Sequence, residues 1–184
     1  MEHFFARLAL WEGGVLLWLQ QLRTPVADAF FSWYTRLGNA GLVWIALSLV
    51  LLVFRRTRKT GVLALFSLLF GFVCCNLTIK PLAARLRPWL VVEGLRALVA
   101  EHDPNSFPSG HSCAAFAAAG VWCRGLSRRW LKVGAIVTAA LMAVSRLYVG
   151  VHFPSDVLAG ALLGSMCAWV VWMAEKRIKR KLRP

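Results

Sequence analysis

The chain has 184 residues, of which 59% are hydrophobic and 16% are charged, and its formal net charge is +14. Soluble domains are typically about 45–50% apolar and about 25% charged, so this composition excludes an ordinary soluble domain and favours an integral membrane protein. The positive charge falls in short runs between long apolar segments, which argues against nucleic acid as a partner and is typical of a membrane protein oriented by its loops.

The N-terminal segment, residues 3–22, is apolar but broken by polar residues and glycines. The interruptions are His3, Arg7, Glu12 and Gly13-Gly14. Trp11 and Trp18 suit a membrane surface, where amphipathic aromatic rings gather. We therefore predict that residues 1–36 form an interfacial segment with an amphipathic helix and a second one over 26–36; a sixth transmembrane span is the alternative.

Five apolar segments follow that could each cross a bilayer, which takes about 20 mostly apolar residues and about 17 at the least. They are residues 37–54, 61–79, 108–123, 133–150 and 157–174. We predict an all-α, polytopic membrane bundle with five transmembrane helices, six possible, in a single domain over 1–184. Within it, residues 37–174 form the core, and Gly160 and Gly164 predict close helix packing.

Three basic segments set the expected orientation: residues 55–59, residues 124–132 and the tail 175–184. With five spans they fall on one side, which should be cytoplasmic because Lys and Arg are enriched in cytoplasmic loops. The loop 80–107 and the turn 151–156 then lie together on the outer side. The unusual polar residues of the chain converge there.

Three cations at the ends of apolar segments on that side predict an anion site: Lys80, Arg87 and Arg146. An ionised group near hydrocarbon costs about 2.5–3.5 kcal/mol at a helix centre, so such residues are usually functional. Arginine binds phosphate oxygens through two parallel hydrogen bonds. For Arg85 and Arg96 we expect only snorkelling to the lipid headgroups.

Two helix starts lie on the same side. Ser109 is a good N-cap before a helix-forming run, Gly110 lets a ligand approach the backbone, and His111 falls in the first turn, where a helix N-terminus attracts anions. At the second start, Asp156 follows His152 by four residues, so its carboxylate can reach the imidazole and fix its tautomer. A capping aspartate beside an interfacial histidine is the alternative.

These three segments, in this order, resemble the type 2 phosphatidic acid phosphatase superfamily, whose pattern is K-x6-RP, PSGH and SR-x5-H-x3-D. The sequence matches every motif position: Lys80, Arg87, Pro88, Pro108, Ser109, Gly110, His111, Ser145, Arg146, His152 and Asp156. The resemblance covers residues 37–174, which makes this core the catalytic part.

The resemblance implies a role for each of these side chains. His152 would attack phosphorus and form a phosphohistidine, Asp156 would orient it, and His111 would protonate the leaving oxygen. The phosphate oxygens would be held by Lys80, Arg87, Ser109, Gly110 and Arg146. Three cations and a helix end can stabilise the transferred group, so we expect no metal and no cofactor.

A membrane-buried site near the outer surface suits a lipid phosphate whose tail stays among the membrane lipids. The resemblance to bacterial lipid phosphatases favours undecaprenyl diphosphate in the cytoplasmic membrane, with the active site on the extracellular or periplasmic side. Phosphatidylglycerol phosphate, phosphatidic acid and lipid A are alternatives. We expect a short helix over 91–100 in the loop 89–107, and solvated positions for Glu93, Glu101, His102 and Asp103.

Two other classes of function stay open. One is a lipid-binding or scramblase-like protein on the phosphatase frame, which the complete set of motif residues disfavours. The other is a metal site formed by His111, His152 and Asp156, which is disfavoured because the nearby cations would repel a metal ion. The sequence sets neither the oligomeric state nor the physiological lipid.

Overall fold

The computed structural model describes residues 2–182 and, within that range, all side chains except those of residues 2–4 and 6. The predicted interruption at His3 and the last two residues of the tail therefore lie outside the described side chains. The described residues form helices and one isolated bridge, between Leu86 and Asn105. The prediction of an all-α fold is confirmed.

The helices follow the predicted segments closely. They are α1 (Glu2–Gln21), α2 (Pro25–Leu37), the 3-10 turn η1 (Asn39–Gly41), α3 (Leu42–Val53), α4 (Arg58–Phe72), the π-helix η2 (Val73–Ile79), α5 (Lys80–Ala83), α6 (Pro88–Val91), α7 (Gly110–Gly125), α8 (Arg129–Tyr148) and α9 (Pro154–Lys181). The last helix continues seven residues beyond the predicted span and into the basic tail.

Three helices within the described residues are long and apolar enough to cross a membrane: the continuous helix Arg58–Ala83, and α8 and α9. The pair Pro25–Leu37 and Asn39–Val53, bent by 50°, would make a fourth as one broken span. Helix α7 has 16 residues, about 24 Å at 1.5 Å per residue, which is shorter than a hydrocarbon core of about 30 Å. The chain is a multi-pass membrane protein, and the count of five spans stays a prediction.

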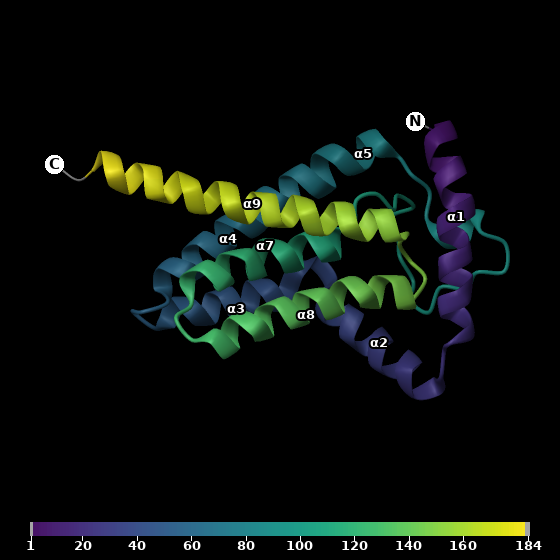
Figure 1. Ribbon diagram of the computed structural model, residues 1–184, viewed down its shortest axis with the longest axis horizontal. Coiled ribbons are helices and arrows are strands. Elements are labelled where there is room, and N and C mark those ends of the chain that lie inside the picture. The colour runs from purple at the N-terminus through teal and green to yellow at the C-terminus, as the bar shows by residue number, and fades with distance from the viewer. Residues whose placement is uncertain (1, 183–184) are drawn as a thin grey trace.

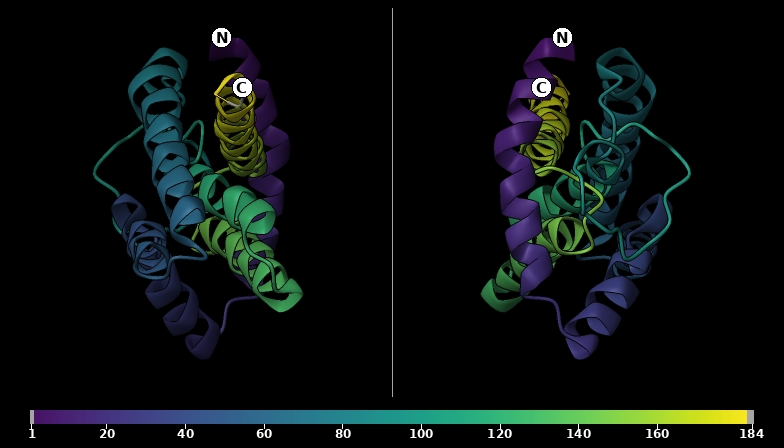
Figure 2. Two further views of the ribbon diagram at one scale, coloured as in Figure 1. Left: turned by 90° about the vertical axis from the view of Figure 1, so that its left-hand side faces the viewer. Right: turned by 90° about the vertical axis from the view of Figure 1, so that its right-hand side faces the viewer.

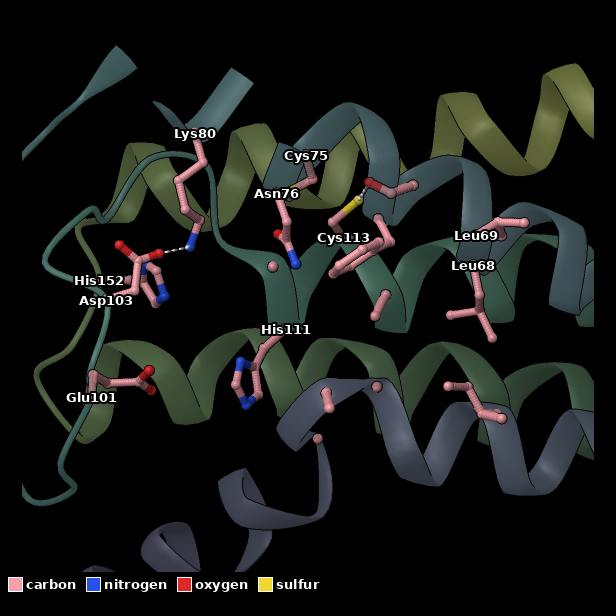
Figure 3. Close-up of a pocket in the computed structure, with 18 of the residues that line it drawn as sticks. Leu68, Leu69, Cys75, Asn76, Lys80, Glu101, Asp103, His111, Cys113 and His152 are labelled. Carbon is pink, nitrogen blue, oxygen red and sulfur yellow. Dashed lines mark hydrogen bonds and ion pairs between the residues drawn. The ribbon is translucent and has the colours of Figure 1, made fainter. Parts of the chain in front are cut away.

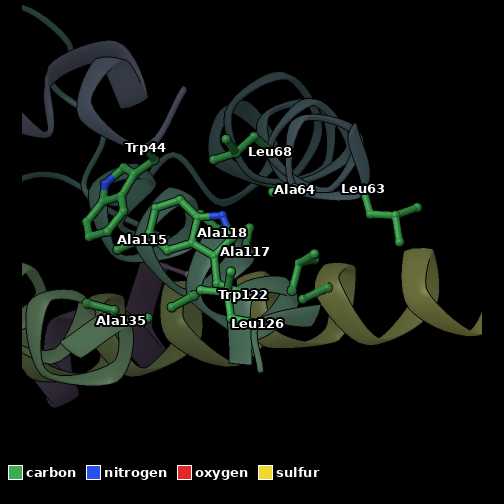
Figure 4. Close-up of a cluster of buried hydrophobic side chains, with 14 of the residues drawn as sticks. Trp44, Leu63, Ala64, Leu68, Ala115, Ala117, Ala118, Trp122, Leu126 and Ala135 are labelled. Carbon is green, nitrogen blue, oxygen red and sulfur yellow. The ribbon is translucent and has the colours of Figure 1, made fainter. Parts of the chain in front are cut away.

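Helix α7 lies at the centre of the bundle, against α4, α8 and α9 (Figure 1). It can do so because its buried face is built of small residues, among them Ala115, Ala117 and Ala118, which let neighbouring helices approach (Figure 4). Larger side chains fill the space beyond this face. The rings of Trp44 and Trp122, for example, have centroids 5.8 Å apart.

Gly160 and Gly164 bring α9 against α7, as their spacing predicts. A Cβ atom at Gly160 would lie 2.4 Å from the carbonyl oxygen of Ser109, and one at Gly164 would lie 2.2 Å from that of Cys113. Neither position can hold a larger residue unless the helices separate. The contact also fixes the two helix starts, because the Ser109 amide donates to the carbonyl of Asp156 at 3.0 Å.

The two ends of the bundle differ in character. The α3–α4 link, the α7–α8 link and the end of α9 lie together at one end (Figure 1), where Lys59 pairs with Glu175 at 2.7 Å. The loop after α5 and the link between α8 and α9 lie at the other end, and α1 lies crosswise over it (Figure 2). This separation matches the predicted grouping of basic segments; which side faces the cytoplasm stays a prediction.

The expected helix over 91–100 is wrong. Beyond α6 the chain is irregular, and Gly94 has a φ of +80°. The backbone polar groups of this stretch find partners elsewhere: Gln20 of α1 donates to the Gly94 carbonyl and accepts from the Arg96 amide, and the Leu98 amide donates to the Val149 carbonyl. These long-range hydrogen bonds replace those that a helix would supply.

Candidate active site

A cavity of about 590 Å³ lies at the end of the bundle where the motif residues gather (Figure 3). Its polar part is lined by Asn76, Lys80, Arg87, Glu101, Asp103, Gly110, His111 and His152. Its apolar part runs between η1, α3, α4 and α7 and is lined by residues such as Ile45, Leu65, Leu68, Leu69 and Phe72. The cavity therefore joins a cationic site to a hydrophobic groove.

His152 is held in the link between α8 and α9 and is 1% exposed. Its Nδ1 atom lies 3.6 Å from Oδ2 of Asp156, which is longer than a hydrogen bond but within ion-pair range. Its Nε2 atom lies 3.3 Å from Nη1 of Arg87. A guanidinium can only donate, so Nε2 is the acceptor and Nδ1 of a neutral ring carries the proton that faces Asp156.

Burial and three cations keep the His152 ring neutral. The pKa of His152 is lowered well below its usual value, mainly by burial of the ring. The charges of Arg146, Arg87 and Lys80 lower it further. A hydrogen bond from the ring to the backbone of Ser106 raises the pKa and opposes this shift in part. At neutral pH Nε2 is therefore unprotonated, and its lone pair accepts from Arg87 on the cavity side.

His111 lies in the first turn of α7 and faces the same cavity. Its Nε2 atom lies 3.1 Å from Oδ1 of Asn39 and 3.5 Å from Nη1 of Arg146. A Cβ atom at Gly38 would lie 2.8 Å from Cδ2 of His111, so the turn before α3 packs closely on the ring. No local pattern in the sequence indicates that Asn39 contacts His111.

The start of α7 has the predicted cap. Ser109 accepts from the Ser112 amide at 3.4 Å, and the Ser112 hydroxyl donates to the Ser109 hydroxyl at 3.1 Å. Gly110 lines the cavity, and a Cβ atom there would lie 2.9 Å from Oδ1 of Asn76. A side chain at residue 110 would therefore have to displace Asn76 at the cavity.

The three predicted phosphate-binding cations come together, and each is paired with a carboxylate. Arg146 and Arg87 both pair with Glu101, the second at 3.3 Å, and Lys80 pairs with Asp103 at 3.3 Å. The expectation that Glu101 is a solvated loop charge is wrong, because its side chain is 19% exposed and pairs with two arginines. Asp103 pairs with Lys80, but its side chain is still 44% exposed. Buried cations need counter-charges, and this loop supplies them.

Arg85 was expected to snorkel, and this too is wrong. Its side chain is buried, with Nη1 2.6 Å from Oδ1 of Asp156 and Nη2 2.7 Å from Oε2 of Glu12. The sequence carried one signal for this contact, namely an acidic residue in the middle of the apolar segment that becomes α1. It did not show which cation Glu12 would meet.

Asn76 is a further polar residue at the cavity that sequence reasoning missed. It lies in the π-helical stretch η2 and points toward Gly110, in the space between Lys80 and His111 (Figure 3). Its Oδ1 atom is buried and has no hydrogen-bond partner within the described part of the chain. Short π-helical stretches inside α-helices are frequent at functional sites, and here the stretch turns a polar side chain into the cavity.

Within residues 2–182, apart from the side chains that are not described, no three His, Cys, Asp or Glu side chains are placed to hold a metal ion together. His111, His152 and Asp156 therefore do not form the ligand set considered above. The polar part of the cavity is instead arranged around three cations and two imidazole rings.

Comparisons with known proteins agree with this geometry. The chain is 37% identical over 132 residues to an undecaprenyl-diphosphatase from Sulfolobus acidocaldarius, and the match covers 72% of this chain but only 62% of that protein. The crystal structure of Aquifex aeolicus LpxE matches with a TM-score of 0.77 and 28% identity, covering 87% of this chain and 93% of that one.

A PAP2-type phosphatidylglycerolphosphate phosphatase from Bacillus subtilis matches with a TM-score of 0.76 and 28% identity, covering 96% and 94% of the two chains. The family model of the PAP2 superfamily matches residues 60–180, a range that runs from α4 almost to the end of α9 and includes all three motifs. The chain therefore belongs to the PAP2 superfamily, whose membrane lipid phosphatases share its fold.

Proposed function

We propose that this protein hydrolyses the phosphate or diphosphate headgroup of a membrane lipid through a phosphohistidine at His152. The observation that carries the proposal is the placement of His152. Its Nε2 atom faces the cationic cavity, its Nδ1 atom faces Asp156, and its lowered pKa keeps the ring neutral and nucleophilic.

Binding would place phosphate oxygens on the side chains of Lys80, Arg87 and Arg146 in exchange for the carboxylates of Glu101 and Asp103. The first amides of α7 add hydrogen-bond donors from the other side. Phosphoryl transfer depends mainly on positioning and on stabilising charge at the equatorial oxygens. Three fixed cations and a helix start supply both, so no metal ion is needed.

In the first step, Nε2 of His152 bonds to phosphorus as the bond to the leaving oxygen breaks, and His111 gives that oxygen a proton. The imidazole becomes cationic, and Asp156 balances its charge. In the second step, water attacks phosphorus, the P–N bond breaks, and His111 takes the proton of the water. Lys80, Arg87 and Arg146 hold the phosphate oxygens throughout.

We propose undecaprenyl diphosphate as the substrate, bound from the outer side of a bacterial cytoplasmic membrane. The apolar part of the cavity can hold a hydrocarbon tail while the headgroup meets the cations. The 37% identity to an undecaprenyl-diphosphatase supports this choice. Phosphatidylglycerol phosphate is the alternative, supported by the likeness to the Bacillus subtilis enzyme.

The test is phosphate release by the full chain, purified in detergent, with a chelator present. Undecaprenyl diphosphate, phosphatidylglycerol phosphate, phosphatidic acid and lipid A are compared. We expect turnover in wild type and none in His152→Ala. His102→Ala is the matched control, because His102 is an exposed histidine of the outer loop and should leave turnover unchanged.

Quenching turnover with an alkaline denaturant should trap a base-stable, acid-labile phosphoenzyme that His152→Ala does not form. Turnover that survives in His152→Ala would contradict the phosphohistidine. Loss of turnover in chelator, restored by added metal, would contradict the metal-free mechanism. Vanadate binding without turnover of any of these lipids would favour a phosphatase with a different substrate over a protein that only binds lipid phosphates.

A further inference from the structure

A buried ion-pair network contacts Oδ1 of Asp156, whereas His152 faces Oδ2. Arg85 donates to Oδ1 of Asp156 at 2.6 Å with one nitrogen and to Oε2 of Glu12 at 2.7 Å with the other. Asp156, Arg85 and Glu12 are 0%, 3% and 2% exposed. The network therefore links α1, the outer loop and the start of α9 through three buried side chains.

The Glu12 carboxylate is fully engaged by its neighbours. Its Oε1 atom accepts from the Ser155 amide at 2.6 Å, and its Oε2 atom accepts from the Ser155 hydroxyl at 3.0 Å as well as from Arg85. The guanidinium of Arg85 also lies 4.0 Å from the centre of the Phe153 ring. Both side chains are thus held in one position.

The two carboxylate oxygens of Asp156 contact different partners. Oδ1 is fixed by Arg85, whereas Oδ2 accepts from the Phe153 amide at 2.8 Å and faces Nδ1 of His152. Without Arg85, Oδ1 would lose the donor that holds it at 2.6 Å, and the carboxylate would be freer to rotate. Buried ion pairs seldom add net stability over apolar packing, so stability alone does not explain this network.

We propose that Arg85 and Glu12 are positioning residues for the reaction: Arg85 fixes the orientation of Asp156 toward His152, and Glu12 of α1 fixes Arg85. This inference rests on the proposed function of His152 and Asp156. Neither residue lines the cavity, so the network should act on the chemical step and leave phosphate binding unchanged. It also gives α1 a part in the active site.

The test compares Arg85→Gln, Arg85→Lys and Glu12→Gln in the full chain, measuring kcat, KM, inhibition by vanadate and Tm. Arg96→Gln and Glu93→Gln are matched controls, because both side chains are exposed in the same outer loop. A misplaced catalytic group loses about 10²-fold in rate. We expect Arg85→Gln to lower kcat about 100-fold and Glu12→Gln about tenfold, with KM and vanadate inhibition within about twofold of wild type.

Two further comparisons separate positioning from folding. Arg85→Lys keeps a cation for Asp156 and should recover part of the lost kcat. Glu12→Gln should cause little further loss in the Arg85→Gln background, because residues of one network have non-additive effects. Should Arg85→Gln fail to fold, the kcat values of Arg85→Lys and Glu12→Gln decide.

Wild-type kcat in Arg85→Gln would overturn the inference. So would a parallel loss of kcat, vanadate binding and Tm without recovery by lysine, since that pattern marks a structural role. An inactive wild type would overturn the proposed function and the inference together. An active wild type with fully active variants would overturn the inference alone.

Discussion

Arg146 donates to the carboxylate of Glu101, so a side chain of the protein holds the guanidinium that is proposed to bind phosphate. Glu101 also pairs with Arg87 at 3.3 Å. The carboxylate takes Nη2 of each guanidinium, so a phosphate oxygen competes with it for those donors. An anion of the protein is therefore already in place where a substrate phosphate is proposed to bind.

Glu101→Gln should strengthen the binding of phosphate analogues. The amide lacks the negative charge that competes for Arg87 and Arg146, and a charge-assisted hydrogen bond contributes about 1.5–3 kcal/mol. We expect vanadate to bind about tenfold more tightly, measured as inhibition of turnover. Glu93→Gln, an exposed glutamate of the same loop, is the control. Weaker binding in Glu101→Gln would mean that the carboxylate instead holds the two guanidinium groups in place.

His152 should stay neutral well below the usual histidine pKa of about 6.5. Burial and the cations Arg146, Arg87 and Lys80 lower its pKa, so the ring takes up a proton only when the pH falls far below that value. ¹⁵N NMR of histidine-labelled protein in detergent checks this, with the signal assigned by its loss in His152→Gln. Arg87→Gln removes one of the charges and should raise the pKa. A ring that is protonated at pH 6.5 in wild type would contradict this reading.

Gly164→Ala should destabilise the protein and reduce turnover. Its Cβ atom would lie 2.2 Å from the Cys113 carbonyl oxygen, so α7 and α9 must separate. Overpacking of this kind costs about 1–3 kcal/mol, and it displaces the helix start that carries Ser109. Thermal unfolding and kcat measure the two effects. Gly134→Ala is the control, because nothing lies within 4 Å of a Cβ atom there; equal behaviour of the two variants would refute the packing argument.

The basic end of the bundle should face the cytoplasm. Fluorescent-protein and alkaline phosphatase reporters fused after the C-terminus test this, because the first folds in the cytoplasm and the second is active only outside. We expect fluorescence and no alkaline phosphatase activity. Replacing the arginines and lysines of residues 55–59 by Gln should weaken the preference. An active alkaline phosphatase fusion to the wild-type chain would reverse the proposed orientation.

The sequence predicted those parts of the site that depend on local chemistry and on the order of the spans. The N-cap at Ser109, the packing of Gly160 and the shared end of the three motifs follow from residue type and spacing. Arg85 and Arg96 show what residue type and spacing cannot predict. Both are arginines of the same outer loop, and only the fold places one beside Glu12, 73 residues away, and the other in solvent.

The helix predicted in the loop 89–107 is wrong for the same reason. An apolar stretch with good helix formers predicts a helix over 91–100 when it is considered alone. Gln20 and Val149 instead offer hydrogen bonds to its backbone, and Glu101 and Asp103 are drawn to cations from two other elements. Contacts between distant segments outweigh local preference there, and no local pattern encodes them.

The π-helical stretch Val73–Ile79 determines the direction in which Lys80 leaves its helix. Hydrogen bonds from residue i to i+5 take in more residues per turn than an α-helix does, so every later side chain is rotated about the axis. One residue corresponds to about 100° of rotation. Removal of a single residue from this stretch would turn Lys80 away from the cavity while leaving the helix intact. The angular phase of one membrane helix is thus as much a part of the anion site as the charge that it carries.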